Sequence, residues 1–264
     1  TGADSLYGTS GANLFDGKGG GDYEYGDGGN DTFVFNAGYG HLEINESYSG
    51  SAQPVLQFGT GITAASVTVK ATSSGNSLVL TDGVSGDQIQ LDYALSSSTS
   101  AGVQTVQFAD GTTWTQQQLI QMETTGTTGA DSLYGTSGAN LFDGKGGNDL
   151  EVGDGGNDTF VFNAGYGHLE INDSYSGSAQ PVLQFGTGIT AASVTAKATS
   201  NGTGLVLTDS VAGDQITLDN MLGYSGYGVQ SVQFTDGTAL TAAQLVQMET
   251  TGTTGADSIY GTSG

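Results

Sequence analysis

The chain has 264 residues, of which 46 are glycine, 27 are acidic and only 4 are basic, and its formal net charge is −23. This charge opposes compaction unless cations offset it, and it argues strongly against nucleic acid as a partner, because nucleic-acid binding needs lysine and arginine. The absence of cysteine excludes disulfides, zinc–thiolate sites and a cysteine nucleophile. No apolar run approaches the ~20 residues of a membrane helix, so no membrane insertion is expected. A general solubility or halophilic role of the acidic residues is the alternative to cation binding.

The first stretch of the chain, residues 2–36, aligns with itself every nine residues. Each unit tends to have glycine at its first and fourth positions, an acid or amide at its sixth, and a large apolar residue at its eighth. The sixth positions hold Asp4, Asn13, Asp22 and Asp31, and the eighth positions hold Leu6, Phe15, Glu24 and Phe33. A flexible glycine–aspartate linker is the alternative, and the periodic apolar residue argues against it.

The chemistry of this nine-residue unit favours a calcium site. Glycine adopts backbone conformations that are closed to residues with a Cβ, so carbonyl oxygens can converge on one point. Aspartate adds a charged oxygen, and Ca2+ takes about six to eight oxygen ligands at flexible geometry. The remaining residues of the unit predict a very short strand with one inward apolar side chain.

The units resemble G-G-x-G-x-D-x-U-x, the nonapeptide of the RTX (haemolysin-type calcium-binding) family, in which U is a large apolar residue. Glu24 at a U position is the clearest departure from it. The resemblance implies an all-β fold, in which each unit is a half-turn of a right-handed parallel β-roll or β-solenoid and Ca2+ lies in the turns between units n and n+2. Asp4 would then lie with Asp22, and Asn13 with Asp31.

After the nonapeptides, short alternating or β-branched runs separated by Gly, Asn, Asp and Ser predict a block of further strands and turns. One short helix is predicted to close each block, because residues 115–118 and 241–244 have the form of a capping box. This block resembles the segment that often follows RTX nonapeptides in large secreted bacterial proteins. The predicted strands are residues 41–44, 55–58, 66–69, 77–80, 88–91 and 103–108, and in the second block 168–171, 182–185, 205–207, 215–218 and 229–234.

The whole arrangement is itself repeated. The residues that begin at Thr1 recur at Thr128, 127 residues later, and again at Thr254, 126 residues later. We therefore expect an excerpt of a longer array that continues end to end. The predicted first repeat unit is residues 1–127, with nonapeptides at 2–36 and a strand block at 37–122. The predicted second unit is residues 128–253, with nonapeptides at 129–163 and a strand block at 164–249, and a third unit starts at 254–264.

By resemblance, several Ca2+ ions bind in each repeat unit, held by sixth-position side chains and by turn glycines. The predicted ligands of the first unit are Asp4, Asn13, Gly17, Gly19, Asp22, Gly26, Gly28 and Asp31. Those of the second are Asp131, Asn140, Gly144, Gly146, Asp149, Gly153, Gly155 and Asp158, and the third unit adds Asp257. Asn13 and Asn140 are neutral and are expected to be the weaker ligands. Asp257 is expected to find its n+2 partner in continuing sequence or in the next molecule of a fibre.

Three further patterns could carry chemistry. His41 and Glu43, and again His168 and Glu170, form an H-x-E pattern on one strand face. A solvent-facing polar strand is the favoured interpretation, because no second histidine lies nearby in the sequence to complete a zinc site. Two acidic sets are interpreted as turn residues, with a peripheral Ca2+ left open: Asp82, Asp87 and Asp92, and Asp209, Asp214 and Asp219. Tyr7, Tyr23, Tyr25, Tyr39, Tyr48 and Trp114 could stack on sugars, although packing is the more common role.

These patterns together predict a non-enzymatic structural module that folds on binding Ca2+, as the stalk of an adhesin or a subunit of an extracellular fibre or matrix. No catalytic or cofactor-binding residue is predicted. A glycan-binding module is the alternative, and a polysaccharide-modifying enzyme with RTX repeats is less favoured, because the chain has only 4 basic residues, all of them lysine. By resemblance only, we expect type I secretion to the cell surface or beyond, and self-association.

Overall fold

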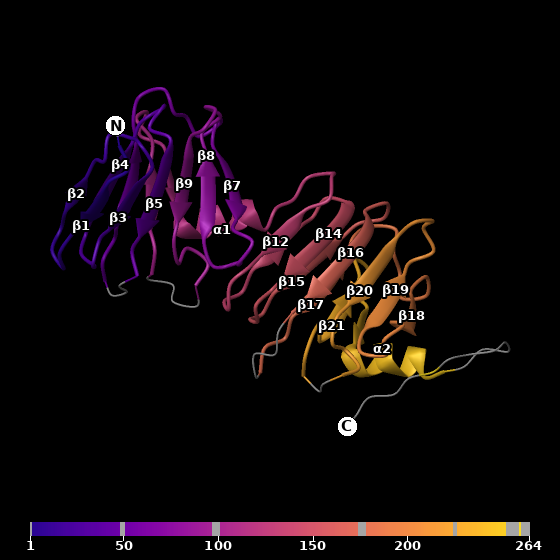
Figure 1. Ribbon diagram of the computed structural model, residues 1–264. Helices are drawn as coiled ribbons and strands as arrows, with labels where there is room; N and C mark the ends of the chain where they lie inside the picture. Colours follow the sequence, from indigo (N-terminus) through magenta and orange to yellow (C-terminus); the bar gives the residue numbers. More distant parts are fainter. Residues whose placement is uncertain are drawn as a thin grey trace. The chain divides into compact units, whose positions relative to one another are not determined.

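The structure, a computed structural model, describes residues 2–47, 51–96, 101–173, 178–223, 226–251 and 259. The chain divides into two compact units, Thr1–Glu123 and Thr124–Gly264 (Figure 1). Each unit consists mainly of β-strands, arranged in one six-stranded and one five-stranded sheet, with one short helix. Within the described ranges, no helix combines the length and the apolar character needed to cross a membrane.

In the first unit, consecutive strands from β1 to β6 alternate between the two sheets (Figure 1). The six-stranded sheet has the order β1-β3-β5-β9-β8-β7, and the five-stranded sheet has the order β2-β4-β6-β10-β11. The strands are β1 Ser5–Tyr7, β2 Leu14–Phe15, β3 Asp22–Tyr25, β4 Thr32–Phe35, β5 His41–Asn45, β6 Val55–Phe58, β7 Thr68–Ala71, β8 Leu78–Thr81, β9 Gln88–Leu91, β10 Thr105–Gln107 and β11 Thr113–Thr115.

Strand pairing follows the nine-residue period of the sequence. β1 pairs with β3 in parallel, and β2 pairs with β4 in parallel, so that Ser5 lies beside Tyr23 and Phe15 beside Phe33. β5 and β6 continue the two parallel ladders. Because paired residues are two nonapeptides apart, units n and n+2 are neighbours in one sheet. The predicted mostly-β, parallel architecture is confirmed.

Each sheet ends in antiparallel strands, which a roll of parallel strands alone does not contain. β7, β8 and β9 pair antiparallel, and so do β10 and β11. Left-handed glycines allow the hairpin turns, Gly75 (φ +72°) before β8 and Gly111 (φ +89°) before β11. The sequence analysis did not predict β11, because three residues are too few to show alternation.

Helix α1, Gln116–Glu123, closes the first unit as predicted. The capping box is present, because the Thr115 hydroxyl accepts a hydrogen bond from the Gln118 amide (3.3 Å) and the Gln118 side chain accepts one from the Thr115 amide (2.8 Å). At the other end of the helix, the buried Glu123 carboxylate accepts a hydrogen bond from the amide of Ala71 (2.7 Å). The helix is therefore fastened to the edge strand β7.

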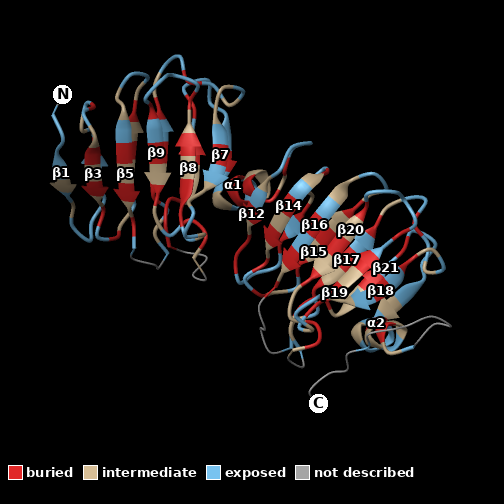
Figure 2. Cartoon of the chain, turned by 45° about the vertical axis from the view of Figure 1, so that its right-hand side comes forward, coloured by how far each residue is buried: buried red, intermediate tan, exposed pale blue. Residues whose placement is uncertain are grey.

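Burial alternates along the strands, and the inward side chains form the apolar core (Figure 2). Aromatic rings of the five-stranded sheet pack in sequence across it. Phe15 stacks on Phe33 with ring centroids 4.9 Å apart, and Phe108 meets Trp114 edge-on at 4.6 Å. Trp114 is therefore a core residue, as the favoured packing interpretation predicts, and it is not available to stack on sugars.

The second unit repeats this topology, with sheet orders β12-β14-β16-β20-β19-β18 and β13-β15-β17-β21-β22. Its helix α2, Ala242–Glu249, has the predicted capping box at Thr241. β18 was not predicted, because Ala196 stands where the first unit has Val69 and the apolar pattern is weaker. The strands are β12 Ser132–Tyr134, β13 Leu141–Phe142, β14 Gly147–Val152, β15 Thr159–Phe162, β16 Gly167–Asn172, β17 Val182–Phe185, β18 Thr195–Ala198, β19 Leu205–Thr208, β20 Gln215–Leu218, β21 Ser231–Gln233 and β22 Ala239–Thr241.

The connector after helix α1 pairs with the nonapeptides of the second unit. Thr125 forms a parallel bridge with Asp143, the Gly126 amide donates to the Asp143 carbonyl (2.9 Å), and the Asp143 amide donates to the Thr124 carbonyl (3.0 Å). The connector therefore adds one parallel bridge beside the end of β13. For this reason the compact units divide after Glu123, whereas the repeat boundary that the sequence predicts lies after residue 127.

Candidate metal sites

The sixth-position aspartates join turns that are two nonapeptides apart. In the first unit, Asp22 Oδ1 accepts a hydrogen bond from the amide of Asp4 (3.0 Å), and Asp31 Oδ1 accepts one from the amide of Asn13 (2.7 Å). These contacts follow from the parallel pairing, which places turn n beside turn n+2. The residues therefore lie together as predicted, and their role as calcium ligands remains a prediction.

The second unit has the same contacts at its own sixth positions. Asp149 Oδ1 accepts a hydrogen bond from the amide of Asp131 (3.0 Å), and Asp158 Oδ1 accepts one from the amide of Asn140 (2.7 Å). Asp149 and Asp158 are buried, as are their counterparts in the first unit. Asp257 lies outside the described residues.

A second buried acid lies beside each of these aspartates, and the sequence analysis did not assign it to the sites. Glu24 Oε1 accepts a hydrogen bond from the amide of Gly17 (3.1 Å), and Glu46 Oε1 accepts one from the amide of Gly28 (3.0 Å). In the second unit, Asp173 Oδ1 accepts a hydrogen bond from an amide in the same way. The resulting pairs are Asp22–Glu24, Asp31–Glu46, Asp149–Glu151 and Asp158–Asp173.

These pairs contain carboxylate oxygens that no hydrogen bond satisfies within the described part of the chain. They are Glu24 Oε2, Asp31 Oδ2, Glu46 Oε2, Asp158 Oδ2 and both oxygens of Glu151. All four lysines are exposed, so no lysine fills the space between the turns. An uncompensated buried charge costs several kcal/mol, and each pair therefore requires a cation or a proton.

The pKa values of these acids are raised, which reflects the same buried and uncompensated negative charge. Burial raises the pKa of Glu24 to about 7, with a further contribution from the charge of Asp22. Burial, and then the contact with Asp31, raises the pKa of Glu46 to about 7. Burial, and then the charge of Asp173, raises the pKa of Asp158 to about 8. Burial also raises the pKa of Glu151 well above its usual value.

Glycine is required where the carboxylates face the turn backbone. A Cβ at Gly153 would lie 2.6 Å from Asp158 Oδ2 and 2.8 Å from Asp173 Oδ1. A Cβ at Gly26 would likewise meet the oxygens of Asp31 and Glu46. Gly17 and Gly144 face Asp22 and Asp149 in the same way. The first glycine of each of these nonapeptides therefore leaves room for charged oxygens.

Other predicted glycines hold the turn geometry instead. Gly28 and Gly155 have left-handed backbone, with φ of +83° and +85°, which a residue with a Cβ adopts only at a cost. Gly19 and Gly146 are also left-handed, and a Cβ there would meet the backbone of Tyr39 or Tyr166 in the next turn of the stack.

Asn13 and Asn140 use their side chains within their own turns. Asn13 Oδ1 accepts a hydrogen bond from the amide of Thr9 (2.8 Å), and Asn140 Oδ1 accepts one from the amide of Thr136 (2.7 Å). A neutral amide oxygen satisfies these turns without adding charge. Asp131 Oδ2 accepts the equivalent bond from the amide of Thr127 (2.6 Å), so the weaker calcium binding expected of asparagine remains a prediction.

The donor set fits calcium. Each site offers two carboxylates with glycine backbone beside them, and all of these donors are oxygen. Mg2+ demands near-ideal octahedral geometry, and zinc prefers nitrogen and sulfur. The described residues contain no group of three or more His, Cys, Asp or Glu that could hold a metal. Main-chain carbonyls would therefore have to complete the coordination shell, as the nonapeptide pattern predicts for its glycines.

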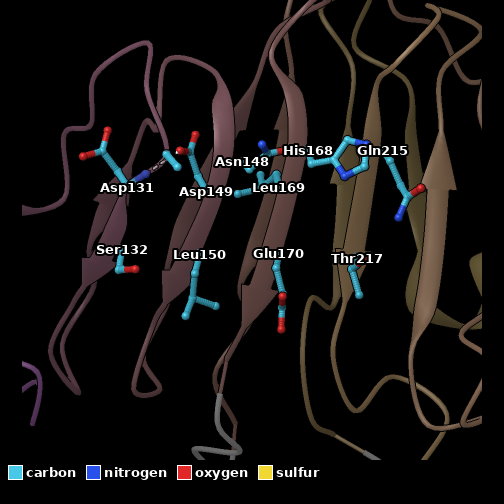
Figure 3. A pocket seen from close by; sticks show the side chains of 11 residues that line it. Asp131, Ser132, Asn148, Asp149, Leu150, His168, Leu169, Glu170, Gln215 and Thr217 are labelled. Carbon is cyan, nitrogen blue, oxygen red and sulfur yellow. Dashed lines mark hydrogen bonds between the residues drawn. The ribbon is translucent and has the colours of Figure 1, made fainter.

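The H-x-E pattern of the second unit lies on the outward face of the sheet, beside two of the predicted calcium ligands. His168 and Glu170 project from β16 into a groove across β12, β14, β16 and β20 that Asp131 and Asp149 also line (Figure 3). Asn148 and Gln215 flank His168 on the neighbouring strands. Both residues of the pattern are exposed, and the interpretation of this strand as having a solvent-facing polar side is confirmed.

Comparison with known proteins gives two family matches and one structural similarity. The RTX calcium-binding nonapeptide repeat (4 copies) matches residues 1–24, 125–160 and 251–264, and the haemolysin-type calcium binding protein related domain matches residues 78–118 and 204–244. No curated protein gave a significant match. Among solved structures, the extracellular lipase LipA from Serratia marcescens is similar over 83% of this chain and 38% of its own, with 18% identity and a TM-score of 0.32. The chain thus spans 38% of that lipase.

The parallel ladders, the glycine turns with their acids, and the two matched models together indicate a protein built from RTX-type repeats. Its nonapeptides match the model of the RTX, or haemolysin-type, calcium-binding repeat.

The raised pKa values predict that acid stabilises the metal-free chain. The folded pKa values of Glu24 and Glu46 are about 7, and that of Asp158 is about 8, above the usual 4.5 and 3.8. The folded state therefore binds more protons than the unfolded state across this window, and its stability falls as the pH rises through the folded pKa values. Thermal unfolding in chelator should give a higher Tm at pH 5 than at pH 8, and excess calcium should remove the difference. A metal-free chain that is more stable at pH 8 would contradict this assignment.

The space that Gly153 leaves for the oxygens of Asp158 and Asp173, here called the glycine cradle, predicts a difference in calcium affinity between two Gly→Ala variants of the second unit. Gly153→Ala places a methyl group among the oxygens of Asp158 and Asp173, and calcium affinity should fall on the order of 10-fold or more. Gly138→Ala is the matched control, because its Cβ would meet only the Thr136 hydroxyl, at 3.5 Å. Isothermal titration calorimetry measures both. Equal affinity in the two variants would show that the cradle is not a metal site.

Proposed function

We propose that this chain is a calcium-loaded structural repeat of a secreted or cell-surface RTX-type protein, and that its nonapeptides form a right-handed β-roll. The observation that carries the proposal is the set of four buried acid pairs, in which oxygens of Glu24, Asp31, Glu46, Glu151 and Asp158 accept no hydrogen bond from a described residue while all four lysines are exposed. Ca2+ at each pair would compensate the charge. The ligands would be the paired acids named above, together with main-chain oxygens of the glycine turns.

Calcium binding in this arrangement is equivalent to folding. Each site joins turns 18 residues apart, as in the bond from the Asp4 amide to Asp22, so the ligands do not converge in an unfolded chain. The binding free energy therefore contributes to the folding free energy. In a chain with a net charge of −23, the cations also relieve self-repulsion. Folding would be confined to places where calcium is plentiful, which suits export by type I secretion and folding outside the cell.

The structural role, as adhesin stalk or subunit of an extracellular fibre or matrix, rests on continuity between repeats. The connector of Thr124, Thr125 and Gly126 pairs with Asp143 and so extends the ladder of the second unit in the N-terminal direction. Residues 250–254 repeat the connector sequence and precede a third start of the nonapeptides. Successive units would thereby stack end to end, with Asp257 placed as Asp131 is. Stability in such arrays comes largely from neighbouring repeats.

A glycan-binding role is the second candidate, and one observation favours it. The rings of Tyr7 and Tyr23 are 6.3 Å apart, and those of Tyr7 and Tyr25 are 6.2 Å apart, on the outward side of β1 and β3. The second unit has Leu150 and Val152 where the first has Tyr23 and Tyr25, so this aromatic group is not a property of the repeat. We therefore place the structural role first and propose no catalytic role.

The calcium assignment predicts a difference between two aspartates of one turn. Asp158→Asn keeps the shape of the side chain and removes its charge, so calcium affinity should fall on the order of 10-fold, because affinity follows ligand charge. Asp154→Asn is the control, since Asp154 lies in the same turn and is exposed. Calorimetric titration compares the two variants. Equal losses at the two positions would contradict the proposal.

The stacking proposal predicts calcium-dependent assembly. With millimolar calcium, the chain should form elongated particles whose length grows with protein concentration, because unpaired ladder edges become available when the turns fold. Light scattering and electron microscopy measure this growth, and chelator should reverse it. Particles that stay compact and monomeric in calcium would refute end-to-end stacking and leave the calcium sites themselves untouched.

A further inference from the structure

A further pair of buried acids lies outside the nonapeptides, in the turn between β8 and β9. Asp82 and Asp87 stand at the two ends of this turn, with 4% and 5% of their surface exposed. The second unit repeats the pair between β19 and β20, where Asp209 is 1% and Asp214 is 5% exposed. The sequence analysis interpreted these acids as turn residues, which are normally solvated. Their burial in both units is therefore unexpected.

Asp87 connects this turn to the glycine-rich turns that stack along the parallel sheet. Its two carboxylate oxygens accept hydrogen bonds from the amides of Gly38 (2.6 Å) and Gly40 (2.9 Å). The same loop is joined to the preceding nonapeptide turn, because the Gly20 amide donates to the Tyr39 carbonyl (3.0 Å). The two hydrogen bonds hold the Asp87 side chain against the loop of Gly38 and Gly40.

Asp214 repeats this contact in the second unit. Its carboxylate accepts hydrogen bonds from the amides of Gly165 (2.6 Å) and Gly167 (3.0 Å). The duplication, with the same partners at equivalent positions, shows that the contact belongs to the repeat.

The second acid of each pair has an oxygen without a hydrogen-bond partner. Asp82 Oδ1 accepts a hydrogen bond from the amide of Val84 (2.9 Å), whereas its buried Oδ2 accepts none from any described residue. Asp209 has the same arrangement, with Oδ1 bonded to the amide of Val211 (2.8 Å) and Oδ2 unsatisfied. Burial, and then the nearby charge of Asp87, raises the pKa of Asp82. Two buried carboxylates therefore meet in this turn. Their negative charge is costly unless a cation or a proton lies between them.

We propose that Asp82 with Asp87, and Asp209 with Asp214, each bind one divalent cation of the hard, oxygen-preferring class, with Ca2+ as the ion to test. The unsatisfied oxygen of Asp82 supplies one ligand and the carboxylate of Asp87 supplies another, while main-chain carbonyls and water complete the shell. These sites are separate from the nonapeptides and do not depend on the function proposed above. Each ion would link the antiparallel hairpin of the strand block, β8–β9 or β19–β20, to the neighbouring glycine turn, and would thereby stabilise both the strand block and the nonapeptides of its unit.

The test counts calcium ions bound to the whole chain in D82N/D209N and in a matched control. Asn keeps the shape of the side chain and its Oδ1 acceptor, so the bond from Val84 can persist. D110N/D236N is the control, because Asp110 and Asp236 are exposed and each accepts an amide hydrogen bond two residues on, from Thr112 and Thr238. Equilibrium dialysis at saturating calcium with elemental analysis should show the loss of one ion per unit in D82N/D209N and no loss in the control.

An unchanged ion count in D82N/D209N would overturn the proposal and would show that a shared proton holds each pair together. If D82N/D209N does not fold, as judged by a circular dichroism spectrum that differs from that of the calcium-loaded wild type, the proposal is tested on the wild-type protein instead. Crystals soaked with terbium should give anomalous peaks between Asp82 and Asp87 and between Asp209 and Asp214. Peaks confined to the nonapeptide turns would overturn the proposal. Loss of the nonapeptide peaks alone would count against the function proposed above and not against these sites.

Discussion

The burial of paired carboxylates, while all four lysines are exposed, is the constraint on which the rest of this structure depends. Asp31 with Glu46, and Asp158 with Asp173, lie in turns that the parallel ladders bring together. One oxygen each of Asp31, Glu46 and Asp158 has no hydrogen-bond donor among the described residues. An apolar core does not remove such a cost. The fold is therefore complete only when protons or cations occupy the turns, and calcium is the divalent ion whose preference for several oxygen ligands suits these turns.

Glycine and the aromatic core solve two different parts of this problem. The glycines leave space for charged oxygens, as at Gly153, where a Cβ would lie within 2.8 Å of carboxylate oxygens of both Asp158 and Asp173. The phenylalanines give each strand an inward anchor, as in the stacked pair of Phe142 and Phe160 with ring centroids 4.9 Å apart. Parallel pairing at an 18-residue spacing connects the two, because it stacks rings on rings and turns on turns. The closing hairpins and the capped helix then cover the edge of each six-stranded sheet, through bonds such as that between Ala71 and Glu123.

The sequence allowed prediction of the ladders that repeat every nine residues, of most strands in the following blocks and of the two capped helices. The grouping of Asp22 with Asp4 and of Asp31 with Asn13 was implied by the resemblance to RTX nonapeptides, in which two units make one turn. Glu46 and Asp173 did not, because they come after the nonapeptides and are out of phase with them. The usable signal was that an acid recurs at the same place in both repeats, and this also holds for Glu24 and Glu151. The strands β11 and β22 were too short to show a pattern, and the burial of Trp114 depends on packing against Phe108 that only the tertiary structure supplies.

The measurement that tests the account most directly is far-ultraviolet circular dichroism of the whole chain in excess calcium and in excess chelator at neutral pH. With −23 net charge and 46 glycines, the metal-free chain should lose the strand spectrum of its nonapeptides, and calcium should restore it. A strand spectrum that is the same in chelator as in calcium would contradict the account, because the buried acids would then be compensated without an ion.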